Sequence, residues 1–303
     1  MANPTIRILR AGDTTKANPF TICIVANPAL EAPWQTGQFI IDPITADAAA
    51  FDACADYINQ SLFAGLPNQQ ETALADPAIA PFVKVVSIIE SGLPPADANA
   101  LVAQDSESDL LIARRTVFRP FLAARNLDAD VAYAVSKSNT HTRASAWFTS
   151  DDDTQGGVPF TLDGQTLAHR YQCLIPGTIA IHSSATSLTA LHEFHHAISS
   201  YTNGSIVDLY VDSSPGLNCK TGRPIPPDFA VYNGVTMASD PVRDHLGYPP
   251  SWQSYHCELH DPNLPAIMDN YWLAAPAADS NACQNDRITR QFVSDRVRAK
   301  LSR

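Results

Sequence analysis

The chain has 303 residues and a formal net charge of −11, with 45% hydrophobic and 17% charged residues. This balance excludes a wholly disordered protein and supplies ample material for a core. The acidic charge argues against a nucleic-acid partner, which would require a concentrated basic surface. No stretch reaches the roughly 18 apolar residues that a membrane-spanning helix needs. The opening MANPTIRILRAG shows no signal peptide, and the residues do not assign a compartment.

Strand-like and helix-like segments alternate through the first half of the chain. In chain order we expect a strand at 22–26, a helix over 45–62, a strand at 82–89, a helix over 108–124 that Pro120 interrupts, and a strand at 131–135. Strands that alternate with helices are joined by right-handed crossovers. The sequence therefore predicts an α/β fold with a mostly parallel sheet.

The pattern changes after this region. Short strands are expected at 144–149 and 178–182, and the acidic loop 151–157 between them is expected to be a solvated turn. We expect the strand at 178–182 to form the sheet edge and to lead into the site helix. Beyond 203 the chain is irregular and rich in proline, and an amphipathic helix is expected over 286–301.

We divide the chain into two lobes of one catalytic domain. The first is an N-terminal α/β lobe, residues 1–185. The second, residues 186–303, contains the site helix and an irregular C-terminal lobe. A long irregular segment is more often a functional wall than a simple connection.

One helix, expected over 187–201, carries the residues for chemistry. At about 100° per residue, His192 and His196 lie only about 40° apart around its axis. Their imidazoles can therefore converge on one ion. The opposite face is apolar and can be buried; it consists of Ala190, Leu191, Phe194, Ala197, Ile198 and Tyr201.

The segment His192-Glu193-Phe194-His195-His196 has the spacing H-E-x-x-H of zinc hydrolases. Two neutral imidazoles and one oxygen ligand suit Zn²⁺ with an open fourth position. Glu193 adjoins the first ligand and is expected to act as general base. His195 is interpreted as a packed or exposed histidine, with a residue that supports the metal ligands or one that faces the substrate as the alternatives.

A third protein ligand should follow the helix. The metzincin extension of the motif is absent, because Thr202 occupies the position of its third histidine. Gly204 permits the chain to reverse, and Asp208 follows it closely, so we favour Asp208 as the third ligand. The alternatives are Asp212, His256 and His260.

The order of HEFHH, glycine and Asp208-Leu-Tyr210 is similar to zinc peptidases that complete their site with aspartate, such as the deuterolysin group. It resembles more closely the IgA-peptidase type of zinc endopeptidase, which has an HEFGH-like helix and an Ala-Asp-Glu-Tyr-like segment after an α/β region. The resemblance implies Asp208 as a ligand and Tyr210 as a catalytic residue, and it is compatible with secretion. This chain departs from the family at His195, where glycine is usual, and by a longer spacer before Asp208.

Further residues could complete such a site. Met268 resembles, in its order along the chain, the methionine of the Met-turn beneath the zinc of metzincin-like enzymes, and an ordinary core methionine is the alternative. Tyr210, Tyr255 and His256 are candidates to stabilise an oxyanion. A polar cluster of Asn139, His141 and Arg143 could line the cleft, although we favour a solvated loop.

These observations predict a zinc metallopeptidase that acts on a peptide or protein substrate. Two alternatives stay open: a zinc hydrolase of a non-peptide amide or ester, and a non-catalytic zinc-binding module. An open coordination position distinguishes a catalytic zinc site from a structural one with four protein ligands.

Overall fold

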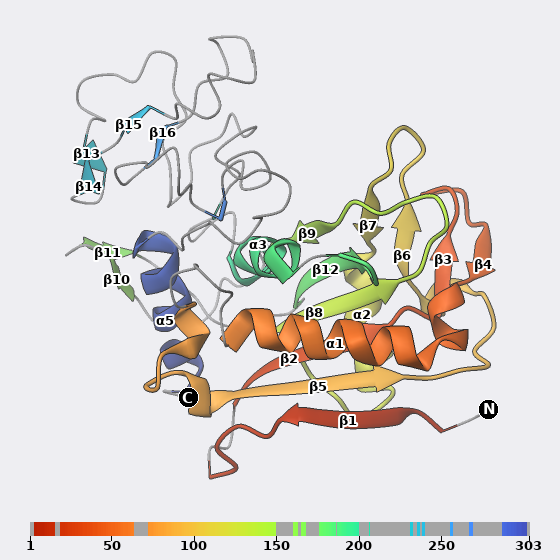
Figure 1. The fold of residues 1–303 in the computed structure, drawn as a ribbon, viewed down its shortest axis with the longest axis horizontal. Helices are drawn as coiled ribbons and strands as arrows, with labels where there is room; N and C mark the ends of the chain where they lie inside the picture. The colour runs from red at the N-terminus through yellow and green to blue at the C-terminus, as the bar shows by residue number, and fades with distance from the viewer. Residues whose placement is uncertain are drawn as a thin grey trace.

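A computed structural model describes residues 3–15, 19–63, 72–149, 176–185, 187–199 and 287–301, together with the short segments 160–162, 165–167, 206, 231–232, 235–236, 238–239, 255–256 and 267–268. Within these residues the centre of the molecule is a six-stranded sheet (Figure 1). Helices cover it on both faces.

The six-stranded sheet is mixed. Its spatial order is β1 (Thr5–Arg10), β5 (Val83–Ile89), β2 (Phe20–Ala26), β8 (Val131–Ser136), β12 (Gly177–His182) and β9 (Ser145–Trp147). The four central strands pair in parallel, and the edge strands β1 and β9 pair antiparallel.

A second, four-stranded sheet is also mixed. Its order is β4 (Phe39–Ile41), β3 (Ala29–Glu31), β6 (Ala100–Gln104) and β7 (Leu111–Ala113), and only β3 and β6 are parallel. The α/β class is therefore confirmed. The predicted mostly parallel arrangement holds only for the four central strands of the larger sheet, and both sheets are mixed.

The remaining elements are helices and short paired strands. The α-helices are α1 (Ala48–Phe63), α2 (Arg115–Ala123), α3 (Ser187–Ile198) and α5 (Arg287–Leu301). The 3₁₀ helices are η1 (Pro43–Ala46), η2 (Ala73–Ala75), η3 (Ala80–Phe82) and η4 (Asp97–Asn99). The two-stranded pairs are β10 (Phe160–Leu162) with β11 (Gln165–Leu167), β13 (Val231–Tyr232) with β14 (Val235–Thr236), and β15 (Ala238–Ser239) with β16 (Tyr255–His256).

The large sheet separates two hydrophobic cores. On β2, Ile22 and Ile24 belong to the core beneath α1 and α3, whereas Cys23 and Val25 belong to the core that contains α2 and the second sheet. Successive side chains of a strand point to opposite faces, so both faces of β2 are buried. This explains why residues 22–26 form an uninterrupted apolar run.

Most of the expected elements are present, with changes at their boundaries. The first helix begins at Ala48, because residues 43–46 form η1 and the Asp47 carboxylate caps α1 by accepting a hydrogen bond from the Ala50 N–H at 3.0 Å. The expected helix over 108–124 is divided into β7 and α2. Pro120 lies inside α2 and has no N–H to donate to the carbonyl of Thr116, one turn earlier. Both residues are exposed, so water can bond to that carbonyl instead.

The prediction that the strand at 178–182 forms the edge of the sheet is wrong. Residues 177–182 form β12, which lies between β8 and β9, so the edge strand is β9. The sequence suggested a strand at 144–149 but did not indicate that it would add to the sheet outside β12. This placement matters for the site, because β9 contacts α3, the helix that carries the histidines.

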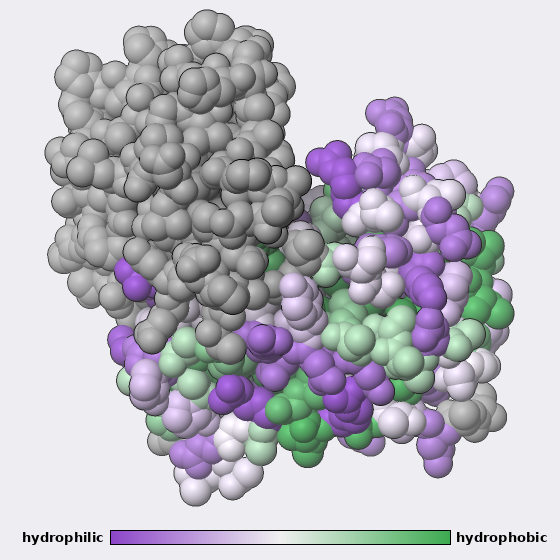
Figure 2. Space-filling view, in the orientation of Figure 1, coloured by the Kyte–Doolittle hydropathy of each residue, from purple (hydrophilic) through white to green (hydrophobic). Residues whose placement is uncertain are grey.

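The visible face of the described residues is a mosaic of hydrophilic and hydrophobic areas (Figure 2). Among the described residues, large exposed apolar side chains lie on β1, β4 and α1 and at Trp34. No helix in the described part of the chain is both long and apolar enough to cross a bilayer.

Candidate metal centre

The helix α3 is fixed to the sheet at two points. At its middle, the Tyr133 hydroxyl on β8 donates a hydrogen bond to the Ala190 carbonyl at 2.8 Å. Burial and the nearby Glu193 carboxylate raise the pKa of Tyr133 well above its ordinary value, so this hydroxyl keeps its proton. At its end, the Ala197 backbone lies directly against Gly177, the first residue of β12.

The two histidines of the motif face one another, as their spacing predicts. The ring centroids of His192 and His196 are 4.9 Å apart, and the rings are inclined at 86°. Both side chains are buried, and Glu193 between them is only 8% exposed. A buried carboxylate beside two imidazoles is stable only with a partner that offsets its lost hydration.

Each imidazole is held in one tautomer by a backbone carbonyl. Nδ1 of His192 lies 2.7 Å from the carbonyl oxygen of Ile267, and Nδ1 of His196 lies 2.8 Å from that of Ile206. A carbonyl oxygen can only accept, so each Nδ1 carries the proton. In the neutral rings Nε2 is then the basic nitrogen. Metal-binding histidines have this arrangement, in which the other ring nitrogen donates to a carbonyl or carboxylate.

Ser199 fixes the position of one of these carbonyls. Its hydroxyl donates to the His196 carbonyl at 2.8 Å and accepts from the Ile206 N–H at 3.0 Å. The Ser199 carbonyl in turn accepts from both the N–H and the hydroxyl of Thr149, at 2.9 and 3.0 Å. The end of α3, the chain after β9 and the residue that orients His196 therefore form one hydrogen-bonded unit.

If His192 and His196 bind zinc, as the sequence predicts, replacing Ser199 with alanine should lower the affinity for zinc by about tenfold, because the Ile206 carbonyl would no longer be held against His196. The free energy of unfolding should fall by about 1 kcal/mol. Competition with a chelating dye measures the affinity, and urea denaturation measures the stability. Ser145→Ala is the matched control, since its hydroxyl also donates to a backbone carbonyl, that of Leu111, at 2.6 Å. Equal affinities of the two variants would contradict this role.

His195 is packed in the interior. It is 1% exposed, and its Nδ1 has no hydrogen-bond partner among the described residues. Burial, followed by the neighbouring His192 and His196, lowers the pKa of His195 to about 3. The ring is therefore neutral, and the interpretation of a packed histidine fits its position better than that of an exposed one.

The edge strand β9 lies beside α3. Phe148, which follows β9 directly, places its ring edge-on to that of His196, with the centroids 6.0 Å apart. Among the strands that the structure describes, β9 pairs only with β12 in the large sheet. Within the described part of the chain, the last strand of the large sheet therefore ends beside His196.

Several expected site residues lie outside the described residues. These are Asp208, Tyr210, Asp212 and His260, together with the acidic loop 151–157. Tyr255 and His256 are described only as the backbone of β16. Within the described part of the chain, no three His, Cys, Asp or Glu side chains gather as a metal site. The third ligand is accordingly still a prediction.

The Met268 prediction falls on a described turn. Ile267 and Met268 are both completely buried in the core that also contains Leu191 and Phe194 of α3. The carbonyl that orients His192 is thus supplied by the residue just before Met268.

In the polar cluster after β8, His141 and Arg143 make structural contacts, and Asn139 is exposed. Both ring nitrogens of His141 are in hydrogen bonds, with the Thr140 hydroxyl and the Asp105 carbonyl. The Arg143 guanidinium lies 3.7 Å from the Asp109 carboxylate on an exposed surface. Both side chains contact the loop before β7, and neither has a described contact with α3.

The groups that orient the histidines were not predicted from the sequence. They are the carbonyls of Ile206 and Ile267 and the side chains of Ser199 and Tyr133. Every residue has a carbonyl, so nothing in the sequence distinguishes these two.

The chain was compared with protein-family models, curated proteins and solved structures, and none of them matched it.

Proposed function

We propose that this protein is a zinc-dependent peptidase with a zincin-like helix, in which His192 and His196 bind the metal. The observation that supports it best is the pair of buried imidazoles, one helical turn apart, each with Nδ1 on a backbone carbonyl. Neutral imidazoles with a fixed tautomer suit Zn²⁺. Asp208 is proposed as the third ligand.

Zinc, when bound, polarises a carbonyl group and lowers the pKa of water towards 7. Glu193 is proposed to accept the proton of the attacking water and to deliver it to the leaving amine. Tyr210 is proposed to donate a hydrogen bond to the developing oxyanion. Burial of Glu193 and of both histidines strengthens these electrostatic interactions, because water screens them less.

The strand edge beside the helix favours a peptide over a small ester. An extended peptide can add to an exposed sheet edge through main-chain hydrogen bonds. Among the described strands β9 is the last of the large sheet, and the ring of Phe148, which follows it, lies edge-on to that of His196. A chain bound along β9 would therefore pass the histidine pair.

A mixed peptide library analysed by mass spectrometry tests the proposal. The purified protein should cleave library peptides, 1,10-phenanthroline should abolish cleavage, and added Zn²⁺ should restore it. Cleavage that survives the chelator would contradict a zinc mechanism. Chelator-sensitive hydrolysis of model esters without any peptide cleavage would favour the non-peptide alternative. Bound zinc without hydrolysis of either would favour a non-catalytic module.

A further inference from the structure

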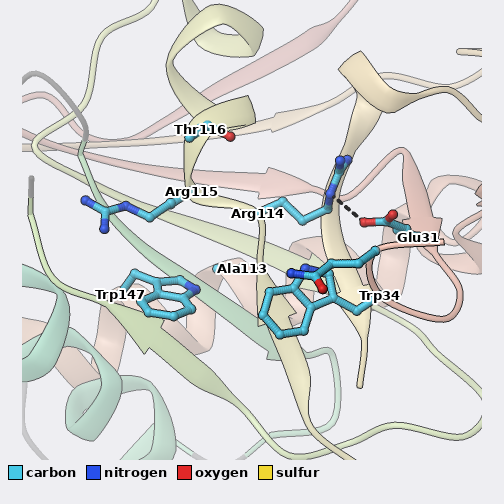
Figure 3. Close-up of a pocket in the computed structure, with 8 residues that line it drawn as sticks. Glu31, Trp34, Ala113, Arg114, Arg115, Thr116 and Trp147 are labelled. Atoms are coloured by element: carbon cyan, nitrogen blue, oxygen red, sulfur yellow. Dashed lines mark ion pairs between the residues drawn. The ribbon is translucent and has the colours of Figure 1, made fainter. Parts of the chain in front are cut away.

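A pocket of about 330 Å³ lies at β9 on the face of the sheet opposite α3 (Figure 3). Trp147 of β9 lines it and packs against the core that contains α2. The preceding Ala146 packs against the core beneath α3. The pocket and the core beneath α3, which contains Leu191 and Phe194 of that helix, therefore lie on opposite faces of β9.

The pocket combines flat aromatic walls with positive charge. Figure 3 shows Trp147 and Arg115 on one side, and Trp34 with the paired Arg114 and Glu31 on the other. A pocket of this size is at the small end of the range for ligand sites, and a single side chain would fill much of it.

The Arg114 side of the pocket is already neutralised and rigid. Nε of Arg114 lies 2.9 Å from the Glu31 carboxylate, and its other nitrogens bond to the Asp97 side chain and to the Asp97 and Ala100 carbonyls. Glu31 also accepts from the Gly37 N–H at 3.0 Å. These bonds tie the loop that carries Trp34 to the start of α2, so the pocket is formed before any ligand arrives.

Arg115 is different. Its Nε is buried without a hydrogen-bond partner, and the ion pairs of the described residues do not include its guanidinium. It is the first residue of α2, which begins without a side-chain cap. The helix start adds partial positive charge at the same place. A buried donor without a partner is costly, so a bound anion would relieve it.

We propose that this pocket binds an acidic side chain of a peptide that lies along β9, an inference that rests on the proposed function. Side chains of an added strand alternate between the two faces of the sheet. Those on the Trp147 face would enter the pocket. There the tryptophan rings would contact the methylene groups, and Arg115 would pair with the carboxylate. A basic side chain would meet Arg115 and be repelled.

Calorimetric titration with two blocked pentapeptides tests this inference. The peptides are acetyl-Ala-Ala-Glu-Ala-Ala-amide and its Gln counterpart, and the protein carries Glu193→Gln and zinc so that neither is cleaved. The Glu peptide should bind about tenfold more tightly. Arg115→Gln should reduce this ratio to about one. Arg119→Gln is the control, because Arg119 is exposed on the same helix and does not line the pocket.

Equal affinities for the two peptides, absence of binding, or a preference that survives Arg115→Gln would each overturn the inference. The readout is binding, so it separates the two proposals. Preference for the Glu peptide in a protein without zinc-dependent cleavage would support the pocket and contradict the peptidase. Zinc-dependent cleavage without that preference would support the peptidase and contradict the proposed role of the pocket.

Discussion

Replacing Glu193 with glutamine should reduce peptide hydrolysis by about 10²–10⁴-fold, whereas the zinc content should stay unchanged. The amide keeps the size of the side chain but cannot accept and return a proton. Steady-state assays on a peptide identified from the library give the rate, and atomic absorption gives the metal content.

Glu90→Gln is the matched control for this change. The Glu90 carboxylate lies 2.7 Å from Nε of Arg125, at the end of β5, and has no part in the proposed chemistry. This variant should keep most of the activity. If Glu193→Gln retained activity comparable to Glu90→Gln, Glu193 would not be the general base, even if zinc were present.

Gly177→Ala should destabilise the protein by about 3 kcal/mol or more, a large effect for the addition of one methyl group. A Cβ at position 177 would lie 1.9 Å from the Ala197 carbonyl oxygen and 2.5 Å from its carbon. Both atoms belong to the backbone of α3, so they cannot move aside as a flexible side chain would. The substitution would have to separate β12 from the helix that carries the histidines.

Urea denaturation followed by circular dichroism measures this effect. Gly92→Ala is the control: Gly92 has a φ of +79° but no atom within 4 Å of the added carbon. It should cost about 1 kcal/mol from backbone strain alone. A loss in Gly177→Ala no larger than in Gly92→Ala would show that β12 and α3 are not packed as described.

The long, strongly periodic elements could be predicted from the sequence. The run at 22–26 is apolar because both faces of β2 are buried, and the helical spacing at 187–201 reflects the packing of α3. α3 is described to Ile198, three residues short of the expected end. The Ser199 N–H still donates to the His196 carbonyl, and the Ser199 hydroxyl accepts a hydrogen bond from the Ile206 N–H.

The second sheet could not be predicted, because three of its four strands have only three residues. A strand of that length contains little more than one period of alternation, so its pattern cannot be distinguished from a loop. The placement of β9 at the edge was missed for a related reason. Its pairing of Thr178 with Trp147 joins segments separated by a long polar connection.

The part of the candidate site that depends on local helix geometry could be predicted from the sequence. Helical spacing alone brings His192 and His196 together, and the 4.9 Å between their rings agrees with it. The carbonyls that orient them come from positions 10 and 75 residues away in sequence. Such contacts depend on the tertiary fold, so no local pattern records them. The pocket at Trp34, Arg115 and Trp147 was missed for the same reason.

The metal content of the purified protein tests the central claim most directly. We expect about one zinc per chain in the wild type and almost none in His196→Ala. His182→Ala should retain zinc, because both ring nitrogens of His182 are in hydrogen bonds with Ser184 and Ser138. A wild-type protein that contains no zinc and cannot be loaded with it, or a His196→Ala variant that binds zinc as tightly as the wild type, would contradict the account.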